Sequence, residues 1–307
     1  MSPESIAYLE RLSSYYRALG YGAPYEWARF ADVPFAPLGM PLAEARLALV
    51  TTAAPYRPEC GDQGPGAPYN AAAKFYSVYD GESSSDPDLR ISHIAIDRQH
   101  TTAADQASYF PLKALRRAVA RGRLGALTPH FFGLPTNRSQ RVTLEVDCVE
   151  LLARCRKDAA DAAILVPNCP VCHQSVALAA RALEAAGIAT VIMGCARDIV
   201  EHVGVPRFLF SDFPLGNSAG KPGDEASQEA SLALALDLLE GATGPRATWQ
   251  SPQAWSADHG WKRDYCNAAL LSAAEIARRR AAFDEGKAIA SGIRREASLT
   301  PPGAADP

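Results

Sequence analysis

Short apolar segments alternate with helical segments along the middle of the chain, and this alternation constrains the fold more than any other feature. The apolar runs at 162–166, 189–193 and 207–210 are too short for buried helices, and Ala- and Leu-rich helical segments follow them. Strands that are joined by helices pair in parallel, and a parallel sheet needs helices on both faces. The sequence therefore predicts an α/β fold with a mostly parallel, doubly wound sheet.

The earlier part of the chain extends this pattern less regularly. Residues 46–52 (RLALVTT) are predicted to form the first strand because they are a short, mostly apolar run rich in β-branched residues. Residues 54–90 are rich in Pro, Gly, Ser and Asp and are predicted to be a long loop region. The remaining predicted elements are strands at 89–96 (LRISHIAI) and 126–132 and helices at 111–121, 142–156, 173–187, 198–203 and 225–239.

We expect three regions along the chain. Residues 1–45 form a helical N-terminal flank, and residues 46–243 form the α/β catalytic region. Residues 244–307 form a C-terminal helical extension whose end, ASLTPPGAADP, is expected to be disordered. A division of the catalytic region into two similar α/β halves, 46–135 and 142–243, stays open.

The composition is that of a soluble globular protein, with 48% hydrophobic and 21% charged residues. A net charge of -3 gives no reason to expect nucleic acid or an anionic membrane as a partner. No segment approaches the ~20 apolar residues that span a bilayer, and the first residues do not resemble a secretory signal. We therefore expect a cytoplasmic protein, in which the seven cysteines stay reduced. In that compartment a close cysteine pair indicates redox, nucleophilic or metal chemistry.

The segment DAAILVPNCPVCHQS, residues 161–175, carries the strongest chemical signal. A buried strand runs into Cys169 and Cys172, and a helix follows them. Ligands of open parallel sheets bind beyond the carboxyl ends of the strands. The first turn of a helix offers free N–H groups and a positive dipole end, and both lower the pKa of a thiol. One sulfur can then attack an electrophile while the other resolves the adduct.

Three other interpretations of the pair stay open. A structural zinc ion would need two further ligands, for which Cys195 and His173 are candidates. The CxxCH pattern also occurs where c-type haem is attached, but attachment normally follows export, and no export signal is present. Both cysteines could also be small core residues. The adjoining histidine and the position between strand and helix favour thiol chemistry, so we expect no resident metal or cofactor beyond a dithiol reductant.

Other predicted strand ends supply polar side chains to the same edge of the sheet. His93 and His130 are candidate catalytic residues, because an imidazole can deprotonate a thiol or protonate a leaving group near neutral pH. An active site needs groups that converge from several strands, so these residues are more informative together than singly. The candidate substrate-binding residues are Asp62, Asp97, Asn168, His173, Cys195 and Asp212.

The segment ILVPNCPVCHQSVALAARALEAAGIATVIM resembles the glycine/sarcosine/betaine reductase selenoprotein B family, which includes the related D-proline reductase subunit. The resemblance extends to RLALVTTAAP, ISHIAID, FPLKALRRAVARGRLG, PHFFG and PRFLFSDFPLGNSAGKPGD, and it covers most of 46–224. The flanks YRALGY and WKRDYCNAALLSAAEIARRRAAFD are similar to those of bacterial homologues that lack selenium.

The resemblance implies a chemistry for the pair. In the selenium-containing members, a selenocysteine paired with a cysteine attacks a carbon that bears an amine, and the C–N bond is cleaved reductively. At the matching position this chain has two ordinary cysteines. The resemblance thus implies that Cys169 is the nucleophile and Cys172 the resolving thiol, with the reverse assignment left open. It also implies a partner reductase subunit.

The first hypothesis for the function is a thiol-dependent reductase of the glycine/proline reductase type. It cleaves a C–N or C–S bond of a small carboxylated, amino-acid-derived substrate and consumes a dithiol. The second is a redox-neutral desulfhydrase or hydrolase that releases sulfide from a thiocarbonyl or thiohydantoin-like compound. The third is a non-catalytic zinc- or thiol-bearing subunit of a reductase complex. Under each of them we expect the chain to form a homo-oligomer.

Overall fold

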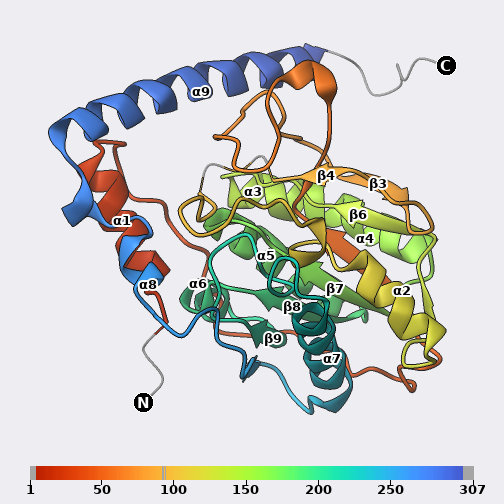
Figure 1. Cartoon of the computed structure of the whole chain (residues 1–307). Helices are drawn as coiled ribbons and strands as arrows, with labels where there is room; N and C mark the ends of the chain where they lie inside the picture. Colours follow the sequence, from red (N-terminus) through yellow and green to blue (C-terminus); the bar gives the residue numbers. More distant parts are fainter. Residues whose placement is uncertain (1–4, 92, 94, 300–307) are drawn as a thin grey trace.

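A computed structural model describes residues 5–91, 93 and 95–299 of the chain. At its centre lies an eight-stranded sheet in the order β10-β9-β8-β7-β1-β6-β3, with β5 also paired to β1 (Figure 1). All of its pairings are parallel except that of β3 with β6. The strands are β1 Arg46–Thr51, β3 Tyr79–Glu82, β5 Ala126–Leu127, β6 His130–Gly133, β7 Ala162–Val166, β8 Ala189–Gly194, β9 Arg207–Phe210 and β10 Ala247–Gln250. The predicted α/β fold is confirmed.

Helices cover both faces of this sheet, because successive strand residues point to opposite sides. In β1, Leu47 and Leu49 belong to the apolar layer under α2 and α7, whereas Ala48 and Val50 belong to the layer under α4, α5 and α6. The helices along the sheet are α2 Leu112–Ala120, α3 Gln140–Val142, α4 Cys148–Lys157, α5 Pro170–Ala185, α6 Arg197–Val203 and α7 Glu225–Gly241, with a π-helical turn at Thr143–Asp147.

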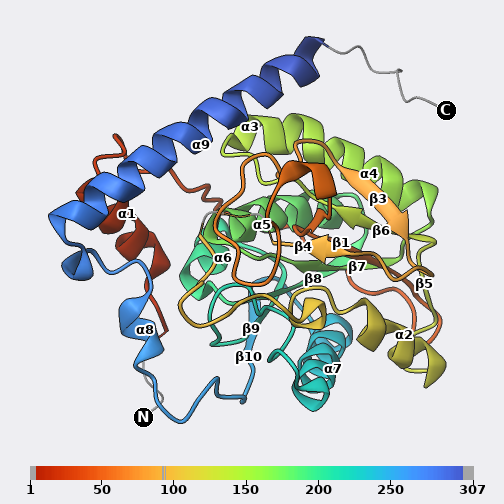
Figure 2. The same ribbon diagram turned by 45° about the horizontal axis from the view of Figure 1, so that its top comes forward.

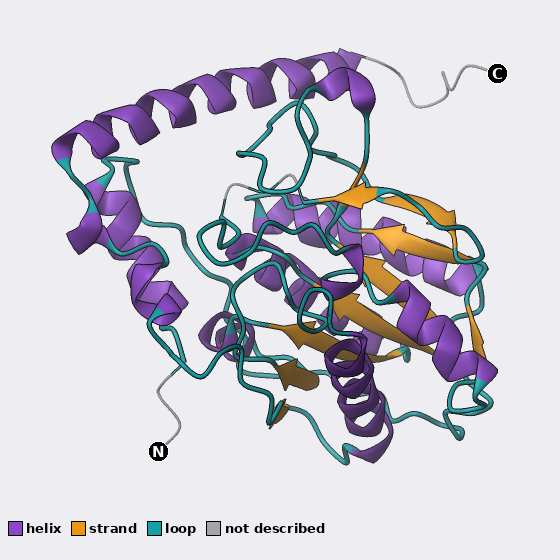
Figure 3. Ribbon diagram, in the orientation of Figure 1, coloured by secondary structure: helices purple, strands orange, loops and turns teal. Residues whose placement is uncertain are grey.

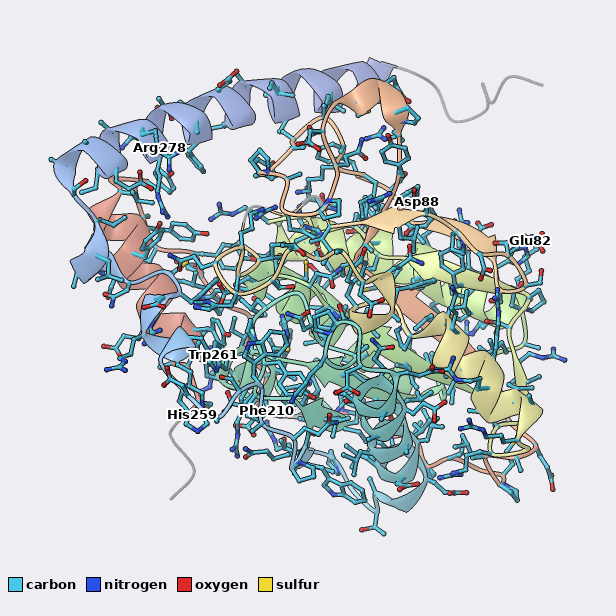
Figure 4. All side chains as sticks on the ribbon, viewed as in Figure 1. Glu82, Asp88, Phe210, His259, Trp261 and Arg278 are labelled. Atoms are coloured by element: carbon cyan, nitrogen blue, oxygen red, sulfur yellow. The ribbon has the colours of Figure 1, made fainter. Side chains whose placement is uncertain are left out.

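The two flanks of the chain pack together beside the sheet. Helix α1 (Tyr8–Ala18) and helix α8 (Trp261–Asp264) share an apolar cluster with α6 that includes Leu12 and Ile199. Trp261 of α8 lies in this cluster (Figure 4). The long helix α9, Ala273–Leu299, then runs from α1 across the loops that follow the strands (Figure 2). None of the helices in the described part of the chain is long and apolar enough to cross a membrane.

The carboxyl ends of the parallel strands open onto loops rather than helices. Figure 3 shows the strand arrowheads directed toward this loop region, with α1 and α9 beyond it. Strands β1 and β7 pair over five residues, Leu47 with Ala162 through Thr51 with Val166, so the segments that follow them emerge side by side. The two ranges considered as possible halves, 46–135 and 142–243, thus contribute strands to one sheet, and the carboxyl ends of their parallel strands lie at the same edge.

The predicted strand at 89–96 is largely wrong. Only β4, Leu89–Arg90, is extended there, and it pairs antiparallel with β2, Ala54–Pro55, in a separate two-stranded sheet. Residues 92 and 94 lie outside the described residues. Beyond them Ile96 packs against the cysteine pair instead of continuing a strand. In the main sheet β1 already pairs with β5, β6 and β7, so this segment finds no free edge beside β1.

Smaller differences have local causes. The predicted strand at 126–132 is divided into β5 and β6, because Pro129 has no N–H to donate to a sheet. The predicted loop at 54–90 contains β3, a polar edge strand (YDGE) without an apolar alternation. Of the expected disordered end, residues 297–299 continue α9, and residues 300–307 lie outside the described residues.

Candidate active site

Cys169 and Cys172 lie where β7 passes into α5. Cys169 is the N-cap residue of this helix, Pro170 occupies its first turn, and the Cys172 N–H donates to the Cys169 Sγ at 3.3 Å. The two sulfur atoms are 2.8 Å apart. A sulfur at the N-cap accepts from an otherwise unpaired backbone N–H and lies at the positive end of the helix dipole. The sequence motif therefore builds a close thiol pair at the carboxyl edge of the sheet.

The surroundings of the two thiols differ. Cys172 is fully buried, and burial acts to raise its pKa, but the Cys169 thiol donates a hydrogen bond that favours its thiolate. His93 and the Thr136 hydroxyl, 3.1 Å away, act in the same direction, so the pKa of Cys172 lies well below its ordinary value. Burial and the contact with Cys172 raise the pKa of Cys169 instead. Within the pair, the proton is therefore favoured on Cys169 and the negative charge on Cys172.

His93 reaches the pair from the segment after β4. Its Nε2 is 2.7 Å from the Thr52 carbonyl, which can only accept a hydrogen bond, so Nε2 carries a proton. The other ring nitrogen, Nδ1, can then interact with the sulfurs. The three residues His93, Cys169 and Cys172 each offer one ligand atom, and these atoms lie within 4.8 Å of one another. Thr52 follows β1, so the neighbouring strands β1 and β7 together fix the histidine and the cysteines.

A cavity of about 430 Å³, here called the cysteine cavity, opens beside the pair. Cys169 and His93 line it, and the fully buried Cys172 lies behind Cys169. Six aromatic residues form much of its wall, and α1, α9 and the loop before β3 contribute to them. They are Tyr16, Tyr21, Tyr25, Trp27, Tyr69 and Phe283.

The charged side chains around the cysteine cavity are all cationic. Lys74, Arg138 and Lys287 line it, and no Asp or Glu is among the described residues of the wall. The Lys74 ammonium donates to the Thr136 carbonyl at 2.7 Å, and its charge acts to lower the pKa of Cys169. The cavity therefore has a positive potential that suits an anionic ligand.

Helix α9 closes one side of the cysteine cavity and is packed lightly there. Phe283 stacks on Tyr21 with ring centroids 3.9 Å apart, and a Cβ at Gly286 would come within 3.2 Å of the Tyr69 ring. From 273 to 293, every α9 side chain is exposed or only half-buried. A helix with so little buried surface separates from the body at lower cost than the core helices do. A second cavity of about 590 Å³ adjoins the first and shares Tyr16 with it.

His173, a predicted substrate-binding residue, is fully enclosed. Its Nδ1 donates to the Cys169 carbonyl at 2.8 Å, and its Nε2 accepts from the N–H groups of Cys195 and Ala196 at 2.9 and 3.2 Å. Burial lowers its pKa to about 4, so the ring is neutral at pH 7. Both nitrogens are used to tie the first turn of α5 to the end of β8.

Two further candidates lie close to the pair. Asn168 is fully buried, its N–H donates to the Thr52 hydroxyl at 3.1 Å, and its side-chain amide has no hydrogen-bond partner among the described residues. Cys195 is buried with its sulfur 3.7 Å from the Ser218 hydroxyl, and burial raises its pKa to about 12. The thiol of Cys195 therefore stays protonated at neutral pH, and unlike Cys169 it does not line the cysteine cavity.

The remaining four candidates are not brought to the cysteine pair. His130 is the first residue of β6, a strand parallel to β1, so it lies at the opposite edge of the sheet, where it bonds Asp158 at 2.9 Å. Asp62 is exposed, and its carboxylate accepts from a neighbouring backbone N–H. The other two make contacts away from the cysteines. Asp97 bonds His100 and lines the adjoining cavity, and Asp212 forms an ion pair with Lys262 of α8.

Sequence reasoning missed several residues of the site. Thr52 and Thr136 each follow a strand, β1 and β6, and the rule that selected the other candidates applies to them equally. Lys74 and most of the aromatic wall residues come from irregular segments, and Tyr16 and Phe283 come from the flanking helices α1 and α9. No spacing in the sequence connects any of them to the cysteines.

The chain is similar to the D-proline reductase subunit gamma of Acetoanaerobium sticklandii. The two are 28% identical over 173 residues, which is 56% of this chain and 71% of that subunit. No family model matches the chain, and no solved structure matches it. The similarity supports a relationship between this chain and proteins of the proline reductase type.

Proposed function

We propose that the chain is a thiol-dependent reductase that cleaves a carbon–heteroatom bond, C–N or C–S, of a small carboxylated substrate. The observation that carries this proposal is the 2.8 Å separation between the sulfur of Cys169, which lines the cysteine cavity, and the sulfur of the fully buried Cys172 behind it. One sulfur can attack a substrate, and the other is close enough to attack the resulting adduct. The similarity to a D-proline reductase subunit is consistent with this chemistry.

The reaction balances with two thiols. Cys169 transfers its proton to the Cys172 thiolate and attacks the substrate carbon, so that a C–S bond forms. The leaving group departs with a proton that His93 relays from water. Cys172 then passes its proton to His93 and attacks the Cys169 sulfur. The C–S electron pair stays on the product carbon, which takes the proton from His93. The substrate gains two electrons, and a disulfide remains for an external dithiol to reduce.

The cationic wall supports a carboxylated substrate. A carboxylate beside Lys74, Arg138 or Lys287 gains charge-assisted hydrogen bonds, and no carboxylate among the described wall residues opposes it. The relative is named as a subunit of a reductase. We therefore propose that a partner protein supplies the dithiol and docks on this chain.

A redox-neutral desulfhydrase is the second candidate, and the aromatic wall favours it. Six aromatic rings around about 430 Å³ suit a flat heterocycle, such as a thiohydantoin, better than a small aliphatic amino acid. Here Cys169 passes its proton to Cys172 and its sulfur adds to the C=S carbon, sulfide leaves, and water releases the product. The electrons balance without a reductant.

One experiment tests the shared basis of both candidates. The reduced protein is treated with limiting iodoacetamide between pH 6 and 8, and labelled cysteines are mapped by mass spectrometry. We expect Cys169 to be labelled before the half-exposed control Cys60, because the Cys172 thiolate can take its proton. Cys172→Ser removes this base and should slow the labelling. If Cys60 reacts first at every pH, the nucleophilic role is refuted. Assays of dithiol oxidation and of sulfide release with carboxylated heterocycles then distinguish the reductase from the desulfhydrase.

A further inference from the structure

We propose that His93, Cys169 and Cys172 also bind a Zn²⁺ ion, with three protein ligands and one open position that faces the cysteine cavity. This inference goes beyond the proposed function, which uses no metal. In the metal-bound state both sulfurs are ligands, so the thiol chemistry is blocked until the ion is removed.

The three ligand atoms already lie close together. One ligand atom of each lies within 4.8 Å of the other two, and the exposed fractions are 5% for His93, 4% for Cys169 and 0% for Cys172. The cysteines are three residues apart on the first turn of α5, and the histidine approaches from another segment. Two thiolates and an imidazole are a ligand set that zinc prefers, and three protein ligands with an open position are typical of catalytic rather than structural zinc.

His93 is oriented as metal-binding histidines usually are. Its Nε2 proton is bonded to the Thr52 carbonyl at 2.7 Å, which fixes the ring and leaves the Nδ1 lone pair for the metal. A backbone carbonyl in this supporting position is a common partner of zinc-ligating histidines. Thr52 directly follows β1, so the main sheet positions the acceptor that orients the ring.

The sulfur positions need one small adjustment. In a tetrahedral site with Zn–S bonds of about 2.3 Å, two sulfurs lie about 3.8 Å apart. Here they are 2.8 Å apart, so they must separate by about 1 Å. Cys169 can rotate in this way because it borders the cysteine cavity. Rotation toward Cys172 leads instead to a disulfide, so metal binding and oxidation exclude each other.

Within the described residues, the group of possible ligands contains only these three. The nearby His173 has both nitrogens occupied by backbone groups, so it cannot complete a four-ligand site. The fourth position is left to water or to a ligand in the cysteine cavity. Lys74 does not prevent binding, since Zn²⁺ with two thiolates carries no net charge.

The test uses the full chain, reduced and freed of metal under anaerobic conditions. It is titrated with Co²⁺, which reports tetrahedral thiolate coordination by visible absorption, and then with Zn²⁺ in competition with a chromogenic chelator. We expect one Zn²⁺ per chain and the cobalt–thiolate bands. His93→Ala should weaken zinc by more than the about 10- to 100-fold that loss of a supporting hydrogen bond costs. Cys172→Ser should abolish the bands, and Cys60→Ser, outside the site, should bind as the wild type does.

The inference is overturned if the wild type binds no stoichiometric zinc, or if His93→Ala binds it as tightly as the wild type. Circular dichroism of each variant shows that it is folded. As a second measurement, zinc should protect Cys169 and Cys172 from iodoacetamide in the wild type but not in His93→Ala. Absence of zinc binding leaves the thiol chemistry intact, since dithiol oxidation is assayed with a chelator present. Absence of dithiol oxidation likewise leaves the metal titration unaffected.

Discussion

Replacing His173 with leucine should destabilise the protein strongly, and by an amount that depends on pH. Leucine fills much of the volume of the imidazole, but it cannot make the three hydrogen bonds that the fully buried ring makes. The Cys169 carbonyl and the N–H groups of Cys195 and Ala196 then lack partners. Each unsatisfied buried group costs about 1 to 3 kcal/mol. Because the site relaxes in part, we expect a loss of about 3 to 5 kcal/mol at pH 7.5.

The pH dependence follows from the pKa of His173, which burial lowers from 6.5 to about 4. A histidine with a lowered folded-state pKa contributes stability that is fully present above 6.5 and is lost as the pH falls toward 4. From pH 7.5 to 5 the wild type should lose about 2 kcal/mol through this group, at 1.4 kcal/mol per pH unit below 6.5. The leucine variant has no such group, so the difference between the two proteins should shrink by that amount.

The assay is urea unfolding of both proteins at pH 7.5 and 5, followed by tryptophan fluorescence and far-UV circular dichroism. Other titrating groups affect both proteins equally and cancel in the comparison. A difference below about 1 kcal/mol at pH 7.5 would refute the role of His173 as a tie between α5 and β8. A difference that stays constant between the two pH values would refute its burial as a neutral ring. Gly194→Ala, whose Cβ would come within 2.9 Å of the His173 ring, should weaken the same tie.

Three further predictions concern other parts of the molecule. Arg207→Met should cost about 3 to 5 kcal/mol in urea unfolding, because it leaves the Glu184 carboxylate, now 2.7 Å from the guanidinium, charged and fully buried; a loss below 1 kcal/mol would contradict this. Gly286→Leu should displace α9 from Tyr69 and speed iodoacetamide labelling of Cys169 severalfold, while the urea midpoint of unfolding stays equal to that of the wild type within error. Lys74→Met should raise KM for a carboxylated substrate at least about tenfold, whereas an equal KM would remove that lysine from substrate binding.

The fold was predictable where the apolar pattern is unambiguous. The strands at 162–166 and 207–210 were placed to the residue, because a fully buried parallel strand is a short apolar run bounded by polar residues. The edge strands β3 and β10 were missed for the opposite reason. Edge strands are half exposed, so their sequences YDGE and ATWQ carry no apolar run.

The site was predictable only in its local part. Cys169 and Cys172 are near in sequence, so the strand-to-helix motif alone places them together. His93 and His130 had equal standing as strand-end residues, but the first is held by Thr52 beside the cysteines and the second starts β6 at the far edge. The Pro129 break decides where β6 begins, and therefore to which edge its histidine belongs.

The geometry also bears on which sulfur attacks. Cys169 is the N-cap, and its side chain leaves the helix at the end that borders the cysteine cavity. Cys172 is three residues further on, faces the interior and has no exposed surface. A substrate carbon could contact its sulfur only if the first turn of α5 moved, and His173 binds that turn to β8. For the proposed reaction, we therefore infer that Cys169 is the attacking sulfur and Cys172 the thiol that resolves the adduct.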